Sequence, residues 1–326
     1  MPCLRLDARA EAWPIHGRFT IARGAKTQAD VVVVSLEHGM GRGECVPYGH
    51  YGETLEGVLA EIEAARAGIE DGCSREQLQT LMGPGAARNA VDCAMWDLQA
   101  KRTGVRAWER AGLNAVTAQV TAYTLSLDEP QAMAAAAHAN AQRPLLKLKI
   151  GGADDLERVA AVRAAAPHAA LIVDANEALS FEDFRRLAPE LAVLGVKLIE
   201  QPLKVGEDVD LEGFESPVPL CADESVHTRA ELAACARRYS AINIKLDKTG
   251  GLTEALALKA EAEALGLQIM AGCMVATSLS MAPAMLVAQG AAYVDLDGPL
   301  LLERDREPGM TYDGSTVRPP APALWG

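Results

Sequence analysis

The chain has few aromatic residues and no cysteine pair with the spacing of a metal or redox motif. Aromatic residues make up 4% of the 326 residues, and the seven cysteines never occur as CxxC. An odd number of scattered thiols argues against a disulfide framework and against a zinc site. We therefore expect reduced thiols and a cytoplasmic location. The cysteines are Cys3, Cys45, Cys73, Cys93, Cys221, Cys235 and Cys273.

Long apolar runs and positive charge are also scarce. No uncharged apolar stretch reaches the roughly 18 residues that suggest a membrane-spanning helix, and the first residues do not read as a signal peptide. Lys and Arg number 31 and Asp and Glu number 44, so the net charge is 31 − 44 = −13. We therefore expect neither a membrane nor a nucleic-acid partner. An anionic small substrate remains compatible, because a basic pocket can lie within an acidic protein.

The first part of the chain, residues 1–115, predicts an α+β domain. "VVVVSLEHGMGRGEC" indicates two strands around a glycine-rich hairpin, with residues 31–36 as the first strand. The amphipathic segments "TLEGVLAEIEAARAGI" and "GPGAARNAVDCAMWDLQAKRTG" indicate two helices, the second ending at Gly104. Strands followed by helices, without alternation, are typical of a separate α+β unit.

From residue 116 onward, short apolar runs alternate with helical segments. A polar residue closes successive runs at positions 149, 174, 200, 223, 245, 273 and 295, in steps of 22 to 28 residues. With the earlier run "AQVTAYTL", this spacing predicts a (β/α)7β barrel of the TIM type over residues 116–299. An open doubly wound sheet is disfavoured, because "KIGG" is not a phosphate-binding GxGxxG loop. We expect the tail, residues 300–326, to join the N-terminal domain.

Three consecutive predicted strands end in carboxylates: Asp174, Glu200 and Asp223. A single aspartate at a strand end is usually a helix cap or a turn residue. Three acids in register are harder to explain in that way, because converging buried carboxylates repel one another unless a cation lies between them. Oxygen ligands favour a hard cation, so we expect one Mg²⁺ per subunit.

Lysines flank this predicted metal site. Lys147 and Lys149 share one face of "LLKLKI", and Lys245 lies on the strand "INIKLDK" on the other side. We expect Asp247 to share a face with Lys245, and Lys248 to face solvent. Structural, ion-paired lysines are the alternative interpretation.

This arrangement suits proton transfer at the carbon next to a Mg²⁺-bound carboxylate. The metal stabilises the enediolate, and a lysine crowded by another cation can act as a base near neutral pH. We expect Lys149 to be an acid/base, Lys147 to lower its pKa, and Lys245 to serve the opposite face. A proton that leaves one face and returns on the other gives epimerisation.

The motifs "KLK", "DAN", "EQP", "ADES" and "NIKLDKTGG" resemble those of the enolase superfamily, in its muconate-lactonising-enzyme subgroup. The resemblance covers almost the whole chain and implies a capping domain followed by a (β/α)7β barrel. It also implies acid/base roles for Lys149 and Lys245, an assisting role for Lys147, and Asp174, Glu200 and Asp223 as metal ligands.

The predicted eighth strand, "YVDLDGP", discriminates among the reactions of this subgroup. Asp295 and Asp297 share a face and suit a substrate ammonium group, which resembles the signature of the dipeptide epimerases. A turn-forming pair is the alternative interpretation of the two aspartates. The other functions left open are dipeptide epimerisation of another specificity, o-succinylbenzoate synthesis, N-acylamino acid racemisation and, more distantly, dipeptide binding without catalysis.

The remaining site residues concern specificity. Strand seven carries Cys273 and Met274 where mandelate-racemase-like branches carry a histidine base, and the nearest histidine, His227, is expected in a loop. In the family, a mobile capping loop helps to recognise the second residue of the dipeptide. The corresponding segment, "FTIARGAKTQAD", offers Arg23 and Lys26 to a side-chain carboxylate. This favours L-Ala-D-Glu and L-Ala-L-Glu, fragments of bacterial cell-wall peptide, and the resemblance also makes a homo-oligomer possible.

Overall fold

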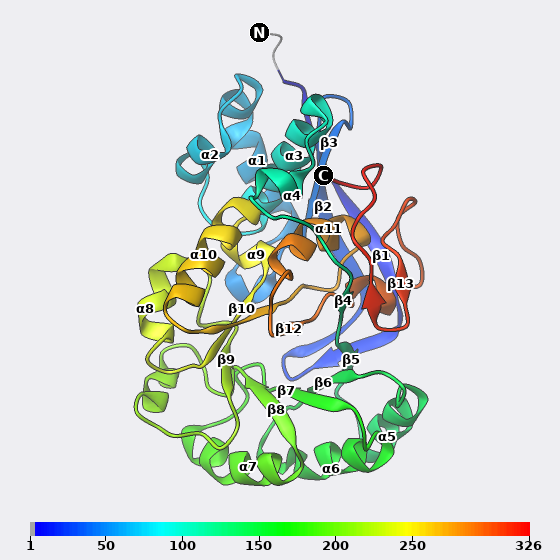
Figure 1. Ribbon diagram of the computed structural model, residues 1–326, viewed down its shortest axis with the longest axis vertical. Coiled ribbons are helices and arrows are strands. Elements are labelled where there is room, and N and C mark those ends of the chain that lie inside the picture. The colour runs from blue at the N-terminus through cyan, green and yellow to red at the C-terminus, as the bar shows by residue number, and fades with distance from the viewer. Residues whose placement is uncertain (1–3) are drawn as a thin grey trace.

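The N-terminal part of the protein is an antiparallel sheet covered by helices. The computed structural model describes residues 4–326, so Cys3 lies outside the described residues. The sheet consists of β1 (Leu6–Ile21), β2 (Gly24–Leu36) and β3 (Gly41–Cys45), in that order. The helices beside it are α1 (Leu55–Glu70), α2 (Arg75–Leu81) and α3 (Ala86–Thr103) (Figure 1). A Cβ at Gly43 would lie 2.1 Å from the carbonyl oxygen of Ala90, so glycine is what lets α3 pack this closely on β3.

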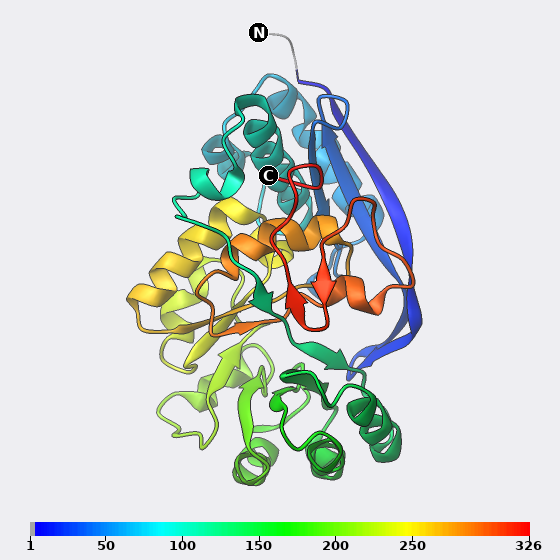
Figure 2. The same cartoon turned by 45° about the vertical axis from the view of Figure 1, so that its right-hand side comes forward.

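The long hairpin of β1 and β2 corrects one expectation. Residues 19–30, expected as a capping loop, form the arms and the turn of this hairpin, with β1 ending at Ile21 and β2 starting at Gly24. The predicted strand 31–36 is only the buried end of β2. Figure 2 shows the hairpin running from the N-terminal sheet down along the barrel.

The second part is a curled sheet of eight parallel strands, as the alternating pattern predicted. Neighbouring strands follow chain order from β5 to β12. The sheet closes on itself, because the N–H of Ala122, just before β5, donates to the carbonyl oxygen of Val294 in β12 at 2.8 Å. The strands are β5 (Tyr123–Leu125), β6 (Leu145–Lys149), β7 (Ala170–Asp174), β8 (Val196–Glu200), β9 (Leu220–Ala222), β10 (Ala241–Ile244), β11 (Gln268–Ala271) and β12 (Tyr293–Val294).

Helices surround this sheet, and an apolar layer fills the barrel. The layer takes one buried side chain from or beside almost every strand: Ala122, Leu145, Ile172, Leu198, Cys221, Ala241 and Met270. The surrounding helices are α5 (Pro130–Ala139), α6 (Leu156–Ala165), α7 (Phe181–Val193), α8 (Leu232–Cys235), α9 (Leu246–Thr249), α10 (Leu252–Ala264) and α11 (Ser278–Val287). Short 3-10 turns complete the connections: η1 (Gly49–Tyr51), η2 (Ala153–Asp155), η3 (Glu207–Leu211), η4 (Arg229–Glu231) and η5 (Gly298–Leu301).

The C-terminal tail returns to both parts of the chain. Its strands β13 (Tyr312–Asp313) and β14 (Thr316–Val317) form a small sheet with β4 (Gln119–Val120). Further on, Trp325 is fully buried and its indole N–H donates to the carbonyl oxygen of Cys93 in α3 at 3.0 Å. The short helix α4 (Ala107–Arg110) lies beside the chain end, where the N–H of Ala107 donates to Gly326. The domain boundary at residues 115 and 116 stays a prediction.

Two absences were expected from the sequence. Within residues 4–326, no helix combines the length and the apolar character needed to cross a membrane. The six cysteines in this range form no disulfide with one another.

Candidate active site

The charged residues predicted from the sequence converge at one end of the barrel. Parallel strands all end at the same rim, so the last residues of β6, β7 and β8 lie side by side there. The register pairs Lys149 with Asp174 and Asp174 with Glu200. Asp223 follows β9 directly, and Lys245 follows β10.

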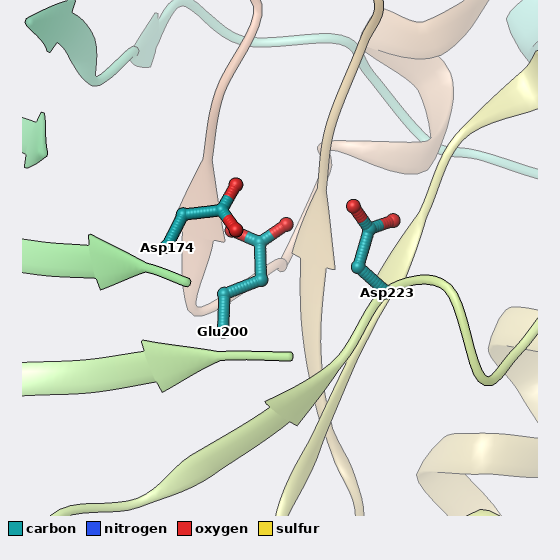
Figure 3. A group of neighbouring side chains, drawn as sticks. All are labelled: Asp174, Glu200 and Asp223. Carbon is teal, nitrogen blue, oxygen red and sulfur yellow. The ribbon is translucent and has the colours of Figure 1, made fainter. Parts of the chain in front are cut away.

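The three carboxylates form a compact, buried cluster. Each of Asp174, Glu200 and Asp223 offers an oxygen within 4.8 Å of the others, and none is more than 1% exposed (Figure 3). Burial, followed by repulsion from Asp174, raises the pKa of Glu200 to about 7. Its Oε2 atom accepts no hydrogen bond of good geometry within residues 4–326, and its close contact is the ion pair with Lys147 Nζ at 2.7 Å. A bound cation would relieve the charge repulsion among these three buried carboxylates, so the donor set fits Mg²⁺.

Lys147 lies at the centre of the acidic groups. Its Nζ atom is 2.7 Å from Glu200 Oε2, 2.9 Å from Asp295 Oδ2 and 3.2 Å from Asp174 Oδ2. Burial opposes the charged form of Lys147, but these carboxylates outweigh burial and raise its pKa well above the usual value. Lys147 is therefore an ammonium in this structure, which suits an electrostatic role.

Lys149 and Lys245 approach the cluster from its two ends. Lys149 Nζ lies 2.5 Å from Asp174 Oδ2, and Lys245 Nζ lies 2.6 Å from Asp223 Oδ2. Burial acts against the charge of Lys245, yet Asp223 and Glu200 raise its pKa well above the usual value. Both side chains line one cavity, so a ligand between them has an amine on either side.

The expectations for Lys248 and Asp247 were wrong. Lys248 is 1% exposed, and its Nζ atom donates to Asp223 Oδ1 at 2.5 Å. Asp247 accepts from the N–H of Val46 at 2.9 Å and from Asn89 Nδ2 at 2.8 Å, so it contacts the N-terminal part and not the metal cluster. The strand β10 ends at Ile244 and the chain turns into α9, which changes the direction of both side chains.

A cavity of about 470 Å³ opens above the cluster, between the barrel rim and the β1–β2 hairpin. Asp295 and Asp297 line it, together with Cys273 and Met274 of the seventh-strand end. Asp297 Oδ2 accepts from the N–H of Thr124 at 2.6 Å. Burial first, and then the charge of Asp295, raise the pKa of Asp297 to about 7.

The hairpin brings Arg23 and Lys26 to the same cavity. Arg23 forms ion pairs with Glu224, at 2.7 Å, and with Glu177, at 3.2 Å. The ammonium of Lys26 lies 5.4 Å from the ring centre of Tyr48, in a cation–π contact. Both cations therefore line the cavity in which an anionic side chain of a ligand would lie. Arg23 already forms ion pairs with Glu224 and Glu177.

His227 lies in a loop, as expected. Its ring packs edge-on against Tyr51, with 4.5 Å between the ring centres. Within residues 4–326, the cavity is lined by Tyr51 but not by His227.

Family comparisons agree with this geometry. The profile described as "Mandelate racemase / muconate lactonizing enzyme, N-terminal domain" matches residues 5–112, and the profile "Enolase C-terminal domain-like" matches residues 131–322. The chain belongs to the mandelate racemase/muconate lactonizing enzyme family of the enolase superfamily. The family fold is therefore the one that the sequence motifs implied.

Several relatives within this superfamily are similar over nearly their whole length. The L-Ala-D/L-Glu epimerase of Escherichia coli (strain K12) is 46% identical over 93% of this chain and 95% of its own. The N-acetyl-D-glutamate racemase of Pseudoalteromonas sp is 45% identical over 91% of this chain and 94% of its own. An enolase family member from Agrobacterium tumefaciens, with homology to dipeptide epimerases and solved with bound sodium and L-Ala-L-Glu, is 56% identical. It superposes with a TM-score of 0.97 and covers 99% of this chain and 100% of its own.

Behind the metal cluster lie residues that the sequence did not single out. Gln201 Oε1 accepts the N–H groups of Asp223, at 2.9 Å, and Ser225, at 3.1 Å, which fixes the loop after β9. Asn243 Nδ2 donates to Glu200 Oε1 at 2.7 Å. Gln201 belongs to the "EQP" motif. A polar residue at a buried position was the sequence signal that could have identified it as part of the site. Asn243 lies in β10 and contacts Glu200 at the end of β8, two strands away in the sheet, so its role depends on the folded barrel.

Proposed function

We propose that the protein is a Mg²⁺-dependent dipeptide epimerase that interconverts L-Ala-D-Glu and L-Ala-L-Glu. The observation that carries this proposal is the placing of Lys149 and Lys245 on either side of a cavity whose rim holds Asp295 and Asp297. The named activity of the Escherichia coli relative, at 46% identity, supports the same reaction. So does the L-Ala-L-Glu bound to the Agrobacterium tumefaciens neighbour.

The metal site and the proton path use different residues of the chain. Asp174, Glu200 and Asp223 would hold the Mg²⁺, which would supply positive charge against the carboxylate of the substrate. One lysine amine takes the proton from the α-carbon of the second residue, and the C–H electron pair moves toward the carboxylate. The ammonium on the opposite face, Lys149 or Lys245, then returns a proton to the same carbon. Inversion follows, with no net gain or loss of protons.

The charged residues that line the cavity suit two charged groups of the dipeptide, its ammonium and its side-chain carboxylate. The substrate ammonium binds Asp295 and Asp297, and Asp295 Oδ1 is a buried atom that lacks a hydrogen-bond partner within residues 4–326. The side-chain carboxylate of the second residue meets Arg23 and Lys26. An acidic second residue is therefore favoured by charge.

N-acetylglutamate racemisation is the second candidate function, because a relative at 45% identity bears the name N-acetyl-D-glutamate racemase. The two substrates share the glutamate and differ in the ammonium group. An N-acyl amino acid has no ammonium for Asp295 and Asp297, so two buried carboxylates at this position favour the dipeptide.

Replacing Asp297 tests this distinction. In Asp297→Asn a neutral amide replaces the carboxylate that accepts from the N–H of Thr124. We expect kcat/KM for L-Ala-L-Glu to fall about 100-fold, because the substrate ammonium loses a charge-assisted hydrogen bond that contributes about 3 kcal/mol. Turnover of N-acetyl-L-glutamate by the same variant is the internal control. A wild-type preference for N-acetylglutamate, together with unchanged kinetics in Asp297→Asn, would favour the racemase instead.

Two further proposals concern the setting of this activity. The free thiols support a cytoplasmic location, where the products of cell-wall turnover would be consumed.

Assembly into a homo-oligomer stays a prediction from the family resemblance.

A further inference from the structure

Two metal-site carboxylates are tied, each by one oxygen, to a donor outside the cavity. Glu200 Oε1 accepts from Asn243 Nδ2 at 2.7 Å, and Asp223 Oδ1 accepts from Lys248 Nζ at 2.5 Å. Asn243 lies in β10, and Lys248 lies in α9, the short helix that follows this strand. We call Asn243 and Lys248 the outer donors.

The second oxygen of each carboxylate faces the cavity lysines. Glu200 Oε2 lies 2.7 Å from Lys147 Nζ, and Asp223 Oδ2 lies 2.6 Å from Lys245 Nζ. Each carboxylate therefore has one oxygen committed to an outer donor and one oxygen turned toward the centre of the cluster.

The third carboxylate follows the same division. Asp174 Oδ1 accepts from the backbone N–H of Asn176 at 3.0 Å, whereas Oδ2 faces Lys149 at 2.5 Å. The backbone conformation at Asn176 is left-handed, with φ 43°, which is part of the turn that aims its N–H back at the carboxylate. The whole cluster thus presents three single oxygens.

Lys248 differs from the lysines of the cavity. Besides Asp223 Oδ1, its ammonium donates to the carbonyl oxygens of Asp223 and Asn243, so all three of its donors are used. Among the residues described, the cavity is lined by Lys245 but not by Lys248. Lys248 therefore has a fixed position and no access to a substrate, which suits a positioning residue.

The number of available oxygens matters for the choice of metal. Mg²⁺ requires close to octahedral coordination by six single ligands, whereas Ca²⁺ accepts six to eight oxygens, including both oxygens of one carboxylate. We propose that Lys248 and Asn243 are positioning residues that restrict Asp223 and Glu200 to one oxygen each, and so make the site prefer Mg²⁺ to Ca²⁺. The inference rests on the metal site of the proposed function but not on its dipeptide substrate.

The two outer donors can be removed separately. Lys248→Met keeps the length of the side chain and removes the ammonium. Asn243→Leu removes the donor to Glu200 without changing the charge, and the buried Asn243 Oδ1 has no partner to lose. Titration calorimetry with Mg²⁺ alone and with Ca²⁺ alone gives the ratio of the two dissociation constants, with no substrate present. We expect each variant to shift this ratio toward Ca²⁺ by at least tenfold.

Lys259→Met is the matched control. Lys259 is also largely buried, and its ammonium donates to the carbonyl oxygens of Val287 and Gln289, but it contacts no metal-site carboxylate in the described part of the chain. We expect this variant to lose stability and to keep the wild-type ratio. If Lys248→Met does not fold, Asn243→Leu decides the outcome without it.

The result that overturns the inference is a ratio within twofold of the wild type in a folded variant of either outer donor. An equal shift in Lys259→Met overturns it as well, because the effect would then not depend on the carboxylates. Failure of the wild-type protein to bind Mg²⁺ is a separate result, since it would remove the metal site of the proposed function itself.

Discussion

Lys149→Ala and Lys245→Ala are each expected to lower the rate of epimerisation of L-Ala-L-Glu by about 1,000-fold or more, because inversion needs a proton carrier on both faces of the α-carbon. Lys149 and Lys245 end 2.5 Å and 2.6 Å from carboxylates at opposite ends of the metal cluster. The measurement is the rate of D-Glu-containing product formation, followed by chiral chromatography under saturating Mg²⁺.

Isotope exchange separates the two lysines. Each single variant keeps one amine, so we expect it to exchange the α-proton of one stereoisomer with D₂O while failing to invert it. The control is Lys197→Ala, which removes an exposed lysine of β8 and should leave the rate unchanged. If either active-site variant retains more than a tenth of wild-type inversion, the two-lysine account fails.

Removing a metal ligand is expected to have an effect of similar size. In Glu200→Gln a neutral amide replaces the carboxylate between Asp174 and Asp223, so Mg²⁺ loses both a ligand and one negative charge. We expect the dissociation constant for Mg²⁺ to rise about 100-fold or more and the epimerase activity to be lost at ordinary Mg²⁺ concentrations. Calorimetry and an activity titration with Mg²⁺ measure the two effects.

Two controls accompany this variant: one tests the dependence on the metal, and the other tests the loss of a negative charge elsewhere. Wild-type protein treated with a chelator should lose activity and recover it when Mg²⁺ is restored. Glu207→Gln removes an exposed acid of η3 and should change neither the affinity for Mg²⁺ nor the activity. A chelated enzyme that remains fully active would show that the carboxylate cluster does not act through a metal.

Much of the site could be predicted because parallel strands repeat a simple geometry. The alternation of side chains within "LLKLKI" places Lys147 and Lys149 on one face, and the register then brings Lys149 beside Asp174. The regular distance between strand ends brings Glu200 and Asp223 to the same rim. The positions of these charged residues follow from the alternation of side chains within a strand and the regular spacing of strands, and both patterns can be read from the sequence.

The predictions for Asp247 and Lys248 were wrong because the regular strand pattern ends before these residues. The pattern of "INIKLDK" suggests a strand through Lys248, but β10 ends at Ile244 and α9 begins at Leu246. Gly250, with φ 73°, ends this short helix in a left-handed conformation. The pair Gly250–Gly251 was the available sequence signal for an early turn.

Long-range pairing explains the other differences. The strand β1 lies at the edge of its three-stranded sheet beside β2, and many of its side chains are exposed, so "LDARAEAWPI" lacks the buried pattern of a central strand. Asn243 becomes part of the metal site only through a hydrogen bond to Glu200, 43 positions away in the sequence. Contacts of this kind depend on the folded barrel and leave no local pattern.

The most direct test of the central claim is the incubation of wild-type protein with L-Ala-L-Glu and Mg²⁺ in D₂O. Mass spectrometry and chiral analysis should show L-Ala-D-Glu that carries one deuterium at the α-carbon of the glutamate and none at the alanine. Product that forms without deuterium, or the absence of both exchange and inversion in the Mg²⁺-loaded protein, would contradict proton transfer between two opposed lysines.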